Sequence, residues 1–284
     1  MFNFVVLPIA LASFVVAQSA SNPALEVEAI KAHFQQAGIV PAGIPSFDPS
    51  AVLVADYAGV GGASPGQALT RAQVGPAPAI TVTPANSSVS LSGPFTLAMV
   101  DFGAVGSDQS AGVTRHWLVN GVTIDNNAVS NASAIAITQY AGPAPPAGSG
   151  PHRYAFLLFA QPESFAPPAD FSQPNIGVSL FDINAYARDS GLGAIVAGNY
   201  ITVEEGTATA SLSATSAVET STLAPVSTSS GASSGGSSST RSSSSPASTS
   251  TAPGGGNANQ NGAAAFTTSL GWLASSVAAF VVFA

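Results

Sequence analysis

The sequence predicts a mostly β protein, an antiparallel β-sandwich or a related sheet fold, with a few helices. Between residues 51 and 158, short apolar segments alternate with turns rich in Gly and Pro, as is typical of such folds. A rigid Gly- and Pro-rich loop, residues 140–151, runs directly into an apolar segment that begins at His152. The chain has 284 residues, which is long enough to bury a substantial core.

The first predicted element is a helix that begins near Ser21–Pro23, where a capping residue precedes a Pro. The apolar residues that recur at helical spacing are Leu25, Ala29, Ile30 and Phe34. Gly38 ends this pattern. His33 lies beside the apolar stripe, and we interpret it as a partly exposed helix residue and not as a ligand.

The predicted strands cover residues 51–57, 79–83, 95–100, 116–119, 135–138, 152–158 and 200–203. A second helix is expected over Phe181–Ser190. In the strand that begins at His152, successive side chains point to opposite faces, so His152 and Tyr154 share one face and Arg153 lies on the other. Arg153 is therefore expected to be structural, in a buried or half-buried ion pair. Arg115 could face either a pocket rim or solvent.

Composition excludes several classes of function. Only 7% of residues are charged, and a single Lys with five Arg residues provides no basic face for nucleic acid. The chain has no Cys, so it forms no disulfide, thiolate metal site or thiol nucleophile. No metal-ligand spacing and no Gly-x-Ser-x-Gly motif occur, although Ser, His and Asp are all present. We therefore expect no metal, no cofactor and no enzymatic activity.

Both ends of the chain resemble processing signals. Residues 1–17 indicate a secretory signal peptide, because residues 2–17 are nearly all apolar and Val15-Val16-Ala17 offers small residues at positions −3 and −1 of a cleavage site; a core strand or helix is the alternative. Residues 18–206 form the expected folded domain. Residues 207–261 are rich in Ser and Thr and predict a disordered, O-glycosylated stalk.

The final segment predicts how the chain is held at a surface. Residues 262–284 match a propeptide for glycosylphosphatidylinositol attachment, with Asn261 or Asn257 as the attachment residue. A C-terminal membrane anchor is the alternative. The protein is thus expected at the cell surface, held on the outer leaflet of the plasma membrane or in the cell wall through the lipid alone. Asn86 and Asn131 are candidate N-glycosylation sites.

The candidate site gathers polar residues at strand ends. Asp101 follows an apolar strand, His116 is expected to open another strand and to share a face with Leu118, and His152 with Tyr154 opens a third. Imidazole, phenol and backbone N–H groups all donate hydrogen bonds to phosphate. The Gly-rich loop offers such backbone donors at Gly148, Ser149 and Gly150. These residue types together indicate a site for a small anion.

The segment Tyr140–Phe156 closely resembles the signature of the phosphatidylethanolamine-binding protein family, and the resemblance extends over about residues 21–205. The order of signal, stalk and anchor identifies a secreted, lipid-anchored, fungal-type member. The resemblance implies a central sheet with a smaller sheet and peripheral helices. The pocket residues that it implies are Asp101, His116, Pro145, Pro146, His152 and Tyr154.

The resemblance also implies a function. The family pocket accepts phosphate-type anions or phospholipid headgroups such as phosphatidylethanolamine. The alternative is inhibition of a serine carboxypeptidase or another protein partner. One departure concerns the rim of the pocket: the Asp-Pro-Asp-Ala-Pro run of the family is Asp101–Val105 here, with Gly103 in place of the second carboxylate.

Overall fold

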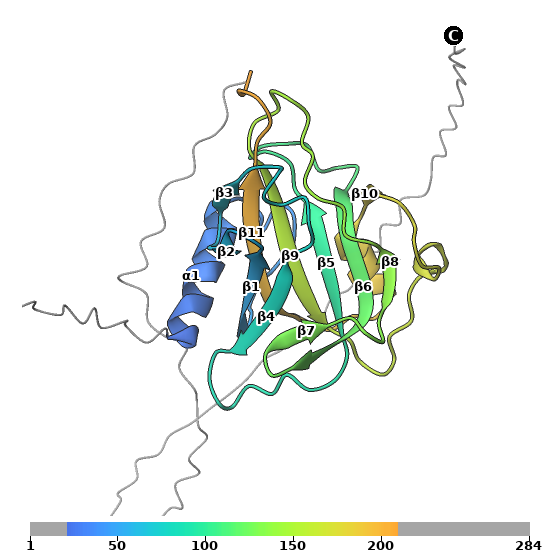
Figure 1. The fold of residues 1–284 in the computed structure, drawn as a ribbon. Coiled ribbons are helices and arrows are strands. Elements are labelled where there is room, and N and C mark those ends of the chain that lie inside the picture. The colour runs from blue at the N-terminus through green and yellow to red at the C-terminus, as the bar shows by residue number, and fades with distance from the viewer. Residues whose placement is uncertain (1–21, 210–284) are drawn as a thin grey trace, which may run out of the picture. The chain divides into compact units, whose positions relative to one another are not determined.

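The computed structural model describes residues 22–209, which form a curled, mostly β structure with two α-helices (Figure 1). The fold class predicted from the sequence is confirmed. The signal peptide, the lipid-attachment segment and almost all of the stalk lie outside the described residues, so those calls stay predictions. Among residues 22–209, no helix is long and apolar enough to cross a membrane.

Helix α1 (Pro23–Gln36) begins where the sequence places it. The side-chain oxygen of Asn22 accepts hydrogen bonds from the backbone N–H groups of Ala24 and Leu25, which satisfies donors that have no partner within the helix. The buried face consists of Val27, Ile30 and Phe34. The predicted stripe was therefore partly wrong, because Leu25 and Ala29 are only half-buried.

Within the described part of the chain, eleven strands form one continuous sheet in the order β2-β1-β4-β7-β6-β5-β9-β11-β3, with β8 and β10 also paired to β6. The strands are β1 (Ala51–Tyr57), β2 (Gly61–Gly62), β3 (Gln67–Leu69), β4 (Ala79–Pro84), β5 (Phe95–Asp101), β6 (Val113–Asp125), β7 (Ala128–Ser130), β8 (Ile135–Thr138), β9 (His152–Ala160), β10 (Ser179–Phe181) and β11 (Ile195–Val203). Neighbours are antiparallel except for β3 and β11. The long strand β6 pairs with β5 along its first part and with β7 at its end, so it joins the central and smaller parts of the sheet.

Several sequence boundaries were wrong. Strand β11 begins at Ile195 and not at Tyr200. Strand β6 begins at Val113, so His116 lies inside the strand and does not open it. Helix α2 (Ile183–Asp189) begins after Phe181, because the carboxylate of Asp182 accepts the first free N–H groups of the helix. Strands β2, β3, β7 and β10 contain only two or three residues, too few for an alternating pattern to show in the sequence.

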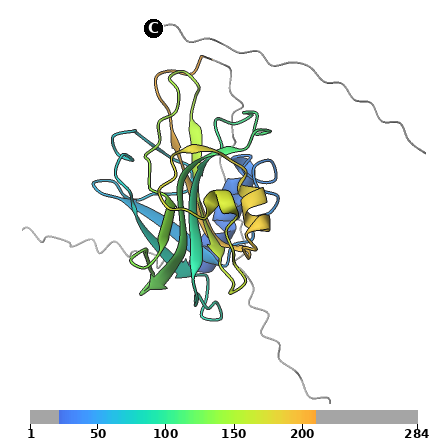
Figure 2. The ribbon, with the colours of Figure 1, turned by 90° about the vertical axis from the view of Figure 1, so that its right-hand side faces the viewer.

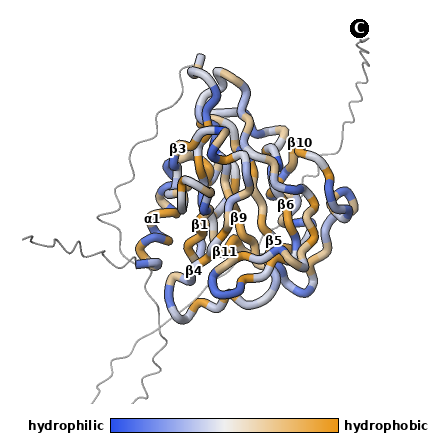
Figure 3. Tube along the Cα trace, in the orientation of Figure 1, coloured by the Kyte–Doolittle hydropathy of each residue, from blue (hydrophilic) through white to orange (hydrophobic). Residues whose placement is uncertain are grey.

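The core lies on both faces of the central strands. Ala155, Leu157 and Phe159 of β9 pack with both helices, in what we call the helix-side cluster. Tyr154, Phe156 and Leu158 pack against β1 and β4, in the inter-sheet cluster. Figure 2 shows both helices on one side of the central strands, and Figure 3 shows the hydrophobic residues gathered along those strands. The alternation predicted for β9 is confirmed.

The two glycosylation candidates lie outside the strands. The side-chain oxygen of Asn86 accepts a hydrogen bond from Ser88 N–H at 2.9 Å, and Asn131 is exposed. Their glycosylation stays a prediction.

Candidate functional site

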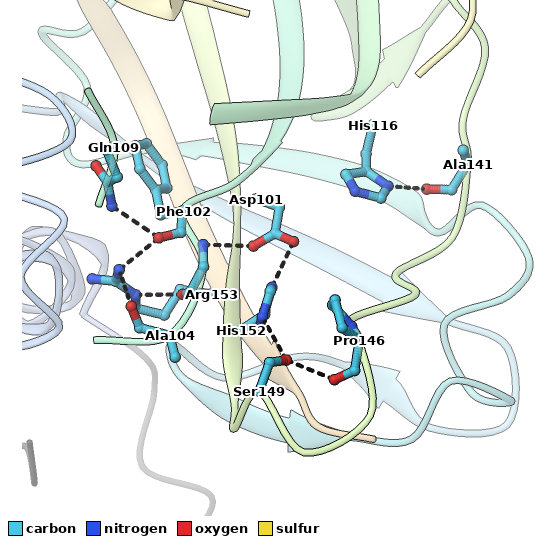
Figure 4. Close-up of polar contacts among 11 residues, drawn as sticks. Asp101, Phe102, Ala104, Gln109, His116, Ala141, Pro146, Ser149, His152 and Arg153 are labelled. Atoms are coloured by element: carbon cyan, nitrogen blue, oxygen red, sulfur yellow. Dashed lines mark hydrogen bonds and ion pairs between the residues drawn. The ribbon is translucent and has the colours of Figure 1, made fainter. Parts of the chain in front are cut away.

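The site is built where the ends of β5 and β9 lie side by side. Asp101, the last residue of β5, pairs in register with Tyr154 of β9. His152 is the first residue of β9, and its Nδ1 donates to Oδ2 of Asp101 at 2.8 Å (Figure 4). The side chains of His152 and Asp101 are 14% and 10% exposed, so the pair is largely shielded from water. The predicted proximity of Asp101 and His152 is confirmed.

Asp101 is held in turn by the loop that follows it. Its Oδ1 accepts the backbone N–H of Gly103 at 2.7 Å. Gly103 has φ of +67°, and a Cβ there would come within 2.7 Å of Ser107 Oγ. An Asp side chain at this position would be strained. The loop conformation therefore requires Gly103 where the family pattern has its second carboxylate.

A β-bulge directs His116 into the site. The pairing register between β5 and β6 shifts at this point, so both His116 and Trp117 face the inter-sheet side, while Arg115 and Leu118 face the helix-side cluster. The expectation that His116 and Leu118 share a face was wrong for this reason. The ring of His116 meets the ring of Tyr154 edge-on, with 5.2 Å between centroids.

The tautomer of His116 follows from its partner. Its Nδ1 lies 2.9 Å from the carbonyl oxygen of Ala141, and a carbonyl only accepts, so Nδ1 carries the proton. Nε2 therefore has a lone pair when the ring is neutral and donates only when the ring is protonated. The backbone N–H of Ala141 in turn donates to the backbone carbonyl of His116. This second hydrogen bond connects β6 to the start of the Gly- and Pro-rich loop.

The hydroxyl group of Tyr154 is the least well hydrogen-bonded polar group of the site. Tyr154 is fully buried, and its hydroxyl lies near the carboxylate of Asp101 and the backbone of Ala144 but makes no hydrogen bond of acceptable geometry with the described residues. Burial raises the pKa of this phenol, and the negative charge of Asp101 raises it further. Its ring stacks on that of His152 with 6.3 Å between centroids. A buried donor without a partner costs about 1–3 kcal/mol, so this hydroxyl is a natural point of contact for a ligand.

The loop does not supply the backbone donors that the sequence predicted. The N–H of Gly148 donates to the carbonyl of Glu205 at 2.8 Å, and that of Ser149 donates to the carbonyl of Pro146 at 3.2 Å. Gly150 N–H makes no hydrogen bond with the described residues. Of the two predicted wall residues, Pro145 is buried and Pro146 is exposed. The backbone N–H groups of Gly148 and Ser149 thus stabilise the loop. Of the three predicted backbone donors, only the N–H of Gly150 is left to bind an anion.

Arg153 and Arg115 are both structural. Arg153 is 3% exposed, and it donates to the backbone carbonyls of Ala37, Phe102, Gly103 and Ala104. Figure 4 shows the contacts with Phe102 and Ala104. The predicted ion pair of Arg153 was wrong, because its four partners are main-chain oxygens. Arg115 is 1% exposed and faces neither a pocket rim nor solvent.

The guanidinium of Arg115 lies among polar and aromatic groups of the helix side. It is placed over the rings of Phe171 and Phe181, at 5.1 and 5.2 Å from their centroids. It donates to Thr138 Oγ1 and to the carbonyl of Gly177. These contacts join β6, β8 and the segment before β10.

Sequence reasoning missed the side chain of Ser149. Its Oγ lies 2.9 Å from Nε2 of His152 and 2.6 Å from the carbonyl oxygen of Pro146. The spacing Ser149-Gly-Pro-His152 was the available signal, since a tight turn at Gly150 can fold a serine back onto a histidine three residues later. Among residues 22–209, no group of three or more His, Cys, Asp or Glu side chains could hold a metal ion.

A family model described as phosphatidylethanolamine-binding protein matches residues 45–211, more than half of the chain. The phomoidride biosynthesis cluster protein N of Talaromyces stipitatus is 41% identical over 76 residues, 25% of this chain and 38% of that protein. The 26 kDa secreted antigen of Toxocara canis is 31% identical over 176 residues, 59% of this chain and 61% of that protein.

The carboxypeptidase Y inhibitor of Saccharomyces cerevisiae is 37% identical over 73 residues, 24% of this chain and 33% of the inhibitor. The matches thus span less than two thirds of each of these relatives. A crystal structure of carboxypeptidase Y inhibitor complexed with its cognate proteinase superposes with a TM-score of 0.51 at 23% identity, covering 66% of this chain and 98% of that chain. This likeness shows the fold.

Proposed function

The chain belongs to the phosphatidylethanolamine-binding protein family, and from this premise we propose that it binds phosphate-type anions, free or in a phospholipid headgroup, at the end of β9. The residues that make up the proposed site are Asp101, His116, Pro145, Pro146, Gly150, His152 and Tyr154. Gly148 belongs to the same loop but acts by holding it in place, since its N–H is already used.

The observation that carries this proposal is the buried hydroxyl of Tyr154. It has no partner among the described residues, and it lies beside His152 and His116. A phosphate oxygen would accept from this hydroxyl and remove the cost of leaving it unpaired. Tyr154 thus supplies the donor, and the two histidines supply a charge that depends on pH.

Charge balance makes proton uptake part of binding. The site holds one carboxylate, Asp101, which repels an anion. Neutral His116 presents only a lone pair at Nε2, since its proton is on Nδ1. Protonation of His116 converts that atom into a donor and adds a positive charge. Affinity for phosphate should therefore be higher at acidic pH, where His116 is protonated, than at alkaline pH.

Calorimetric titration with inorganic phosphate tests the site. A charge-assisted hydrogen bond contributes about 1.5–3 kcal/mol, so Tyr154→Phe and His152→Ala should each weaken binding by roughly ten- to a hundredfold. Tyr186→Phe is the matched control, because the Tyr186 hydroxyl already has a partner in Asn120, at 2.9 Å. The proposal fails if Tyr154→Phe binds phosphate as tightly as the parent protein.

The source of the phosphate is decided by further titrations. Phosphorylethanolamine and vesicles that contain phosphatidylethanolamine present the same group on a headgroup. Equal affinity for inorganic phosphate and phosphorylethanolamine would point to a free anion as the ligand. Binding that requires the amine or the vesicle would point to a lipid.

Inhibition of a serine carboxypeptidase is the second candidate function. It is supported by the 37% identity with a carboxypeptidase Y inhibitor over 73 residues, although this match covers only a third of that protein. The test is an assay of carboxypeptidase Y activity with increasing amounts of this protein. Full activity at a large molar excess would exclude this candidate.

We further propose that the chain is secreted and held at the cell surface by a glycolipid at Asn261 or Asn257. The order of apolar start, Ser- and Thr-rich segment and apolar end supports this proposal. A relative, the Toxocara canis antigen, is named as secreted. Phosphatidylinositol-specific phospholipase C should release the protein from membranes. Retention, with the Leu270–Ala284 peptide still present by mass spectrometry, would contradict a lipid anchor.

A further inference from the structure

Three side chains at the site stand in the order of a nucleophile, its base and the carboxylate that orients the base. Ser149 Oγ lies 2.9 Å from His152 Nε2, and His152 Nδ1 lies 2.8 Å from Asp101 Oδ2. From this geometry we propose that Ser149 is an acyl acceptor, which takes acyl groups from acyl phosphates. The choice of a phosphate leaving group rests on the proposed anion site; the nucleophile itself does not.

The arrangement satisfies the geometric test for an activated serine. The hydroxyl is within hydrogen-bond reach of an imidazole, and a third group fixes the other side of that imidazole. Asp101 is itself fixed, because Gly103 N–H donates to its second oxygen at 2.7 Å. Ser149 is only half-buried, so an acyl donor can reach it. Figure 4 shows Asp101, His152 and Ser149 in this order.

The proton on Ser149 has two possible acceptors, and the charge of His152 selects between them. When His152 is neutral with its proton on Nδ1, Nε2 only accepts, so Ser149 donates to it. When His152 is protonated, Nε2 donates to Ser149 Oγ, and the Ser149 proton turns to the carbonyl of Pro146, at 2.6 Å. The neutral state is the nucleophilic one, whereas the protonated state holds the loop closed and attracts anions.

The transfer step balances with residues already in place. Ser149 Oγ attacks the carbonyl carbon of the acyl phosphate while its proton passes to His152 Nε2. The new Oγ–C bond forms, the C–O bond to the phosphate breaks, and the electron pair leaves with the phosphate. The proton on His152 is then available to the departing phosphate, and Asp101 stabilises the imidazolium in between.

Two donors are available for the negative charge that develops. The Tyr154 hydroxyl is buried without a partner, and Gly150 N–H, next to the nucleophile, makes no hydrogen bond with the described residues. Hydrogen-bond donors that are not already used are what a tetrahedral oxyanion requires. The same Tyr154 hydroxyl is the one proposed to bind phosphate, so inorganic phosphate should compete with acyl transfer.

The pH dependence of acyl transfer is opposite to that of binding. The titratable groups around His152 are Asp101 from β5, His116 from β6 and Tyr154 from β9. Arg71 and Glu205, at the edge of the loop, pair with each other at 3.3 Å. Because acyl transfer needs neutral His152, its rate should rise with pH, while phosphate affinity should fall. If a pH-dependent change in the fold were the cause, the rate of acyl transfer and the affinity for phosphate would change in the same direction.

The test uses acetyl phosphate and peptide mass spectrometry on the full chain. The peptide that contains Ser149 should gain one acetyl group, and His152→Ala should slow this by about a hundredfold or more, the usual contribution of a general base. Ser172 is an internal control in the same digest, because its Oγ donates to the carbonyl three residues earlier, at 2.7 Å, just as Ser149 does. No His contact of Ser172 occurs among the described residues, so it should stay unmodified.

Each outcome decides between the two proposals. Acetylation at Ser149 that His152→Ala removes and that inorganic phosphate competes supports the inference. Phosphate binding without acetylation at Ser149 overturns it and leaves the proposed function standing. Acetylation of Ser149 and Ser172 at equal rates also overturns it, since the contact with His152 would then contribute nothing. Failure of both phosphate binding and acetylation would remove both proposals.

Discussion

His152 and Asp101, 51 positions apart in the chain, meet through a 2.8 Å contact between Nδ1 and Oδ2. The next residue of β9, Arg153, holds the same segment from the opposite face through the carbonyls of Phe102, Gly103 and Ala104. Adjacent residues of a strand point to opposite faces. His152 therefore fixes the carboxylate of Asp101 on one face, and Arg153 fixes the backbone of residues 102–104 on the other. The site on one face therefore depends on packing on the other.

Replacing Arg153 with Ala should cost stability more than phosphate affinity. The change removes four hydrogen bonds from a buried guanidinium, and bonds of this charged kind contribute about 1.5–3 kcal/mol each. The carbonyl of Ala37 then has no donor, whereas the carbonyls of Phe102, Gly103 and Ala104 keep Gln109 Nε2, the Arg153 N–H and the Ser107 N–H. We expect a loss of about 3 kcal/mol or more, measured by urea unfolding. Arg188→Ala is the control, because Arg188 is 70% exposed and pairs only with its neighbour Asp189. Equal midpoints for the two variants would refute the structural role of Arg153.

All five tyrosines should stay protonated in the folded protein above the ordinary phenol pKa of 10. Burial is the main cause in each case, and it raises the pKa of Tyr140 and of Tyr186 to about 12. Above pH 10 the unfolded chain then binds fewer protons than the folded one, so stability is complete below that pH and falls as pH rises towards the folded values.

Ultraviolet absorbance of tyrosinate measures this directly. In the folded protein, the absorbance should appear together with alkaline unfolding, as one cooperative step. In urea, the same five groups should titrate near their ordinary value. A fifth of the signal appearing near pH 10 before any unfolding would show that one tyrosine is accessible, contrary to the structure.

Much of this fold was predictable from local sequence. Asn22 with Pro23 marks the start of α1, and the alternation from His152 sorts β9 into two faces, because both features depend only on neighbouring residues. The bulge at His116 was not predictable, since it arises from pairing with β5. The partners of Arg153 could not be predicted either, because they are main-chain oxygens of two other segments, at Ala37 and at Phe102–Ala104, and main-chain oxygens leave no sign in the sequence.

The candidate site shows the same division. Asp101, His152 and Tyr154 could be selected by residue type and by resemblance, and β5 and β9 do bring them together. The loop amides were misjudged because the acceptor of Gly148 N–H lies after the last strand, at Glu205, and the acceptor of Ser149 N–H is the carbonyl of Pro146 across the turn. Ser149 was overlooked as a side chain because its contact with His152 depends on how the loop closes.

Gly148→Ala should destabilise the protein more than Gly59→Ala. Both glycines have φ near +80°, which costs an L-residue about 1–2 kcal/mol. A Cβ at position 59 meets nothing within 4 Å, whereas one at position 148 comes within 3.1 Å of Thr209 Cγ2. Thermal unfolding of both variants isolates the contact with Thr209. Identical unfolding temperatures would mean that Thr209 moves away freely.

The segment that follows β11 should determine how firmly the loop is closed. Thr209 donates to the carbonyl of Gly148 from both its N–H and its hydroxyl, at 3.0 and 3.1 Å, and Glu205 accepts from the N–H of Gly148. A chain that ends after Gly206 loses the Thr209 bonds, while one that ends after Thr209 keeps them. The shorter chain should be less stable by about 1 kcal/mol, the usual net contribution of such hydrogen bonds.

Hydrogen exchange locates the effect of this truncation. The amides of Gly148 and Ser149 should exchange faster in the chain that ends after Gly206, while the central strands stay protected. Arg71→Ala is the control in the longer chain, because its pair with Glu205 is about half exposed at both ends and contributes about 0–1 kcal/mol. If both truncated chains exchange alike, Thr209 does not hold the loop, and Ser149 reaches His152 through the turn at Pro146–Gly150 alone.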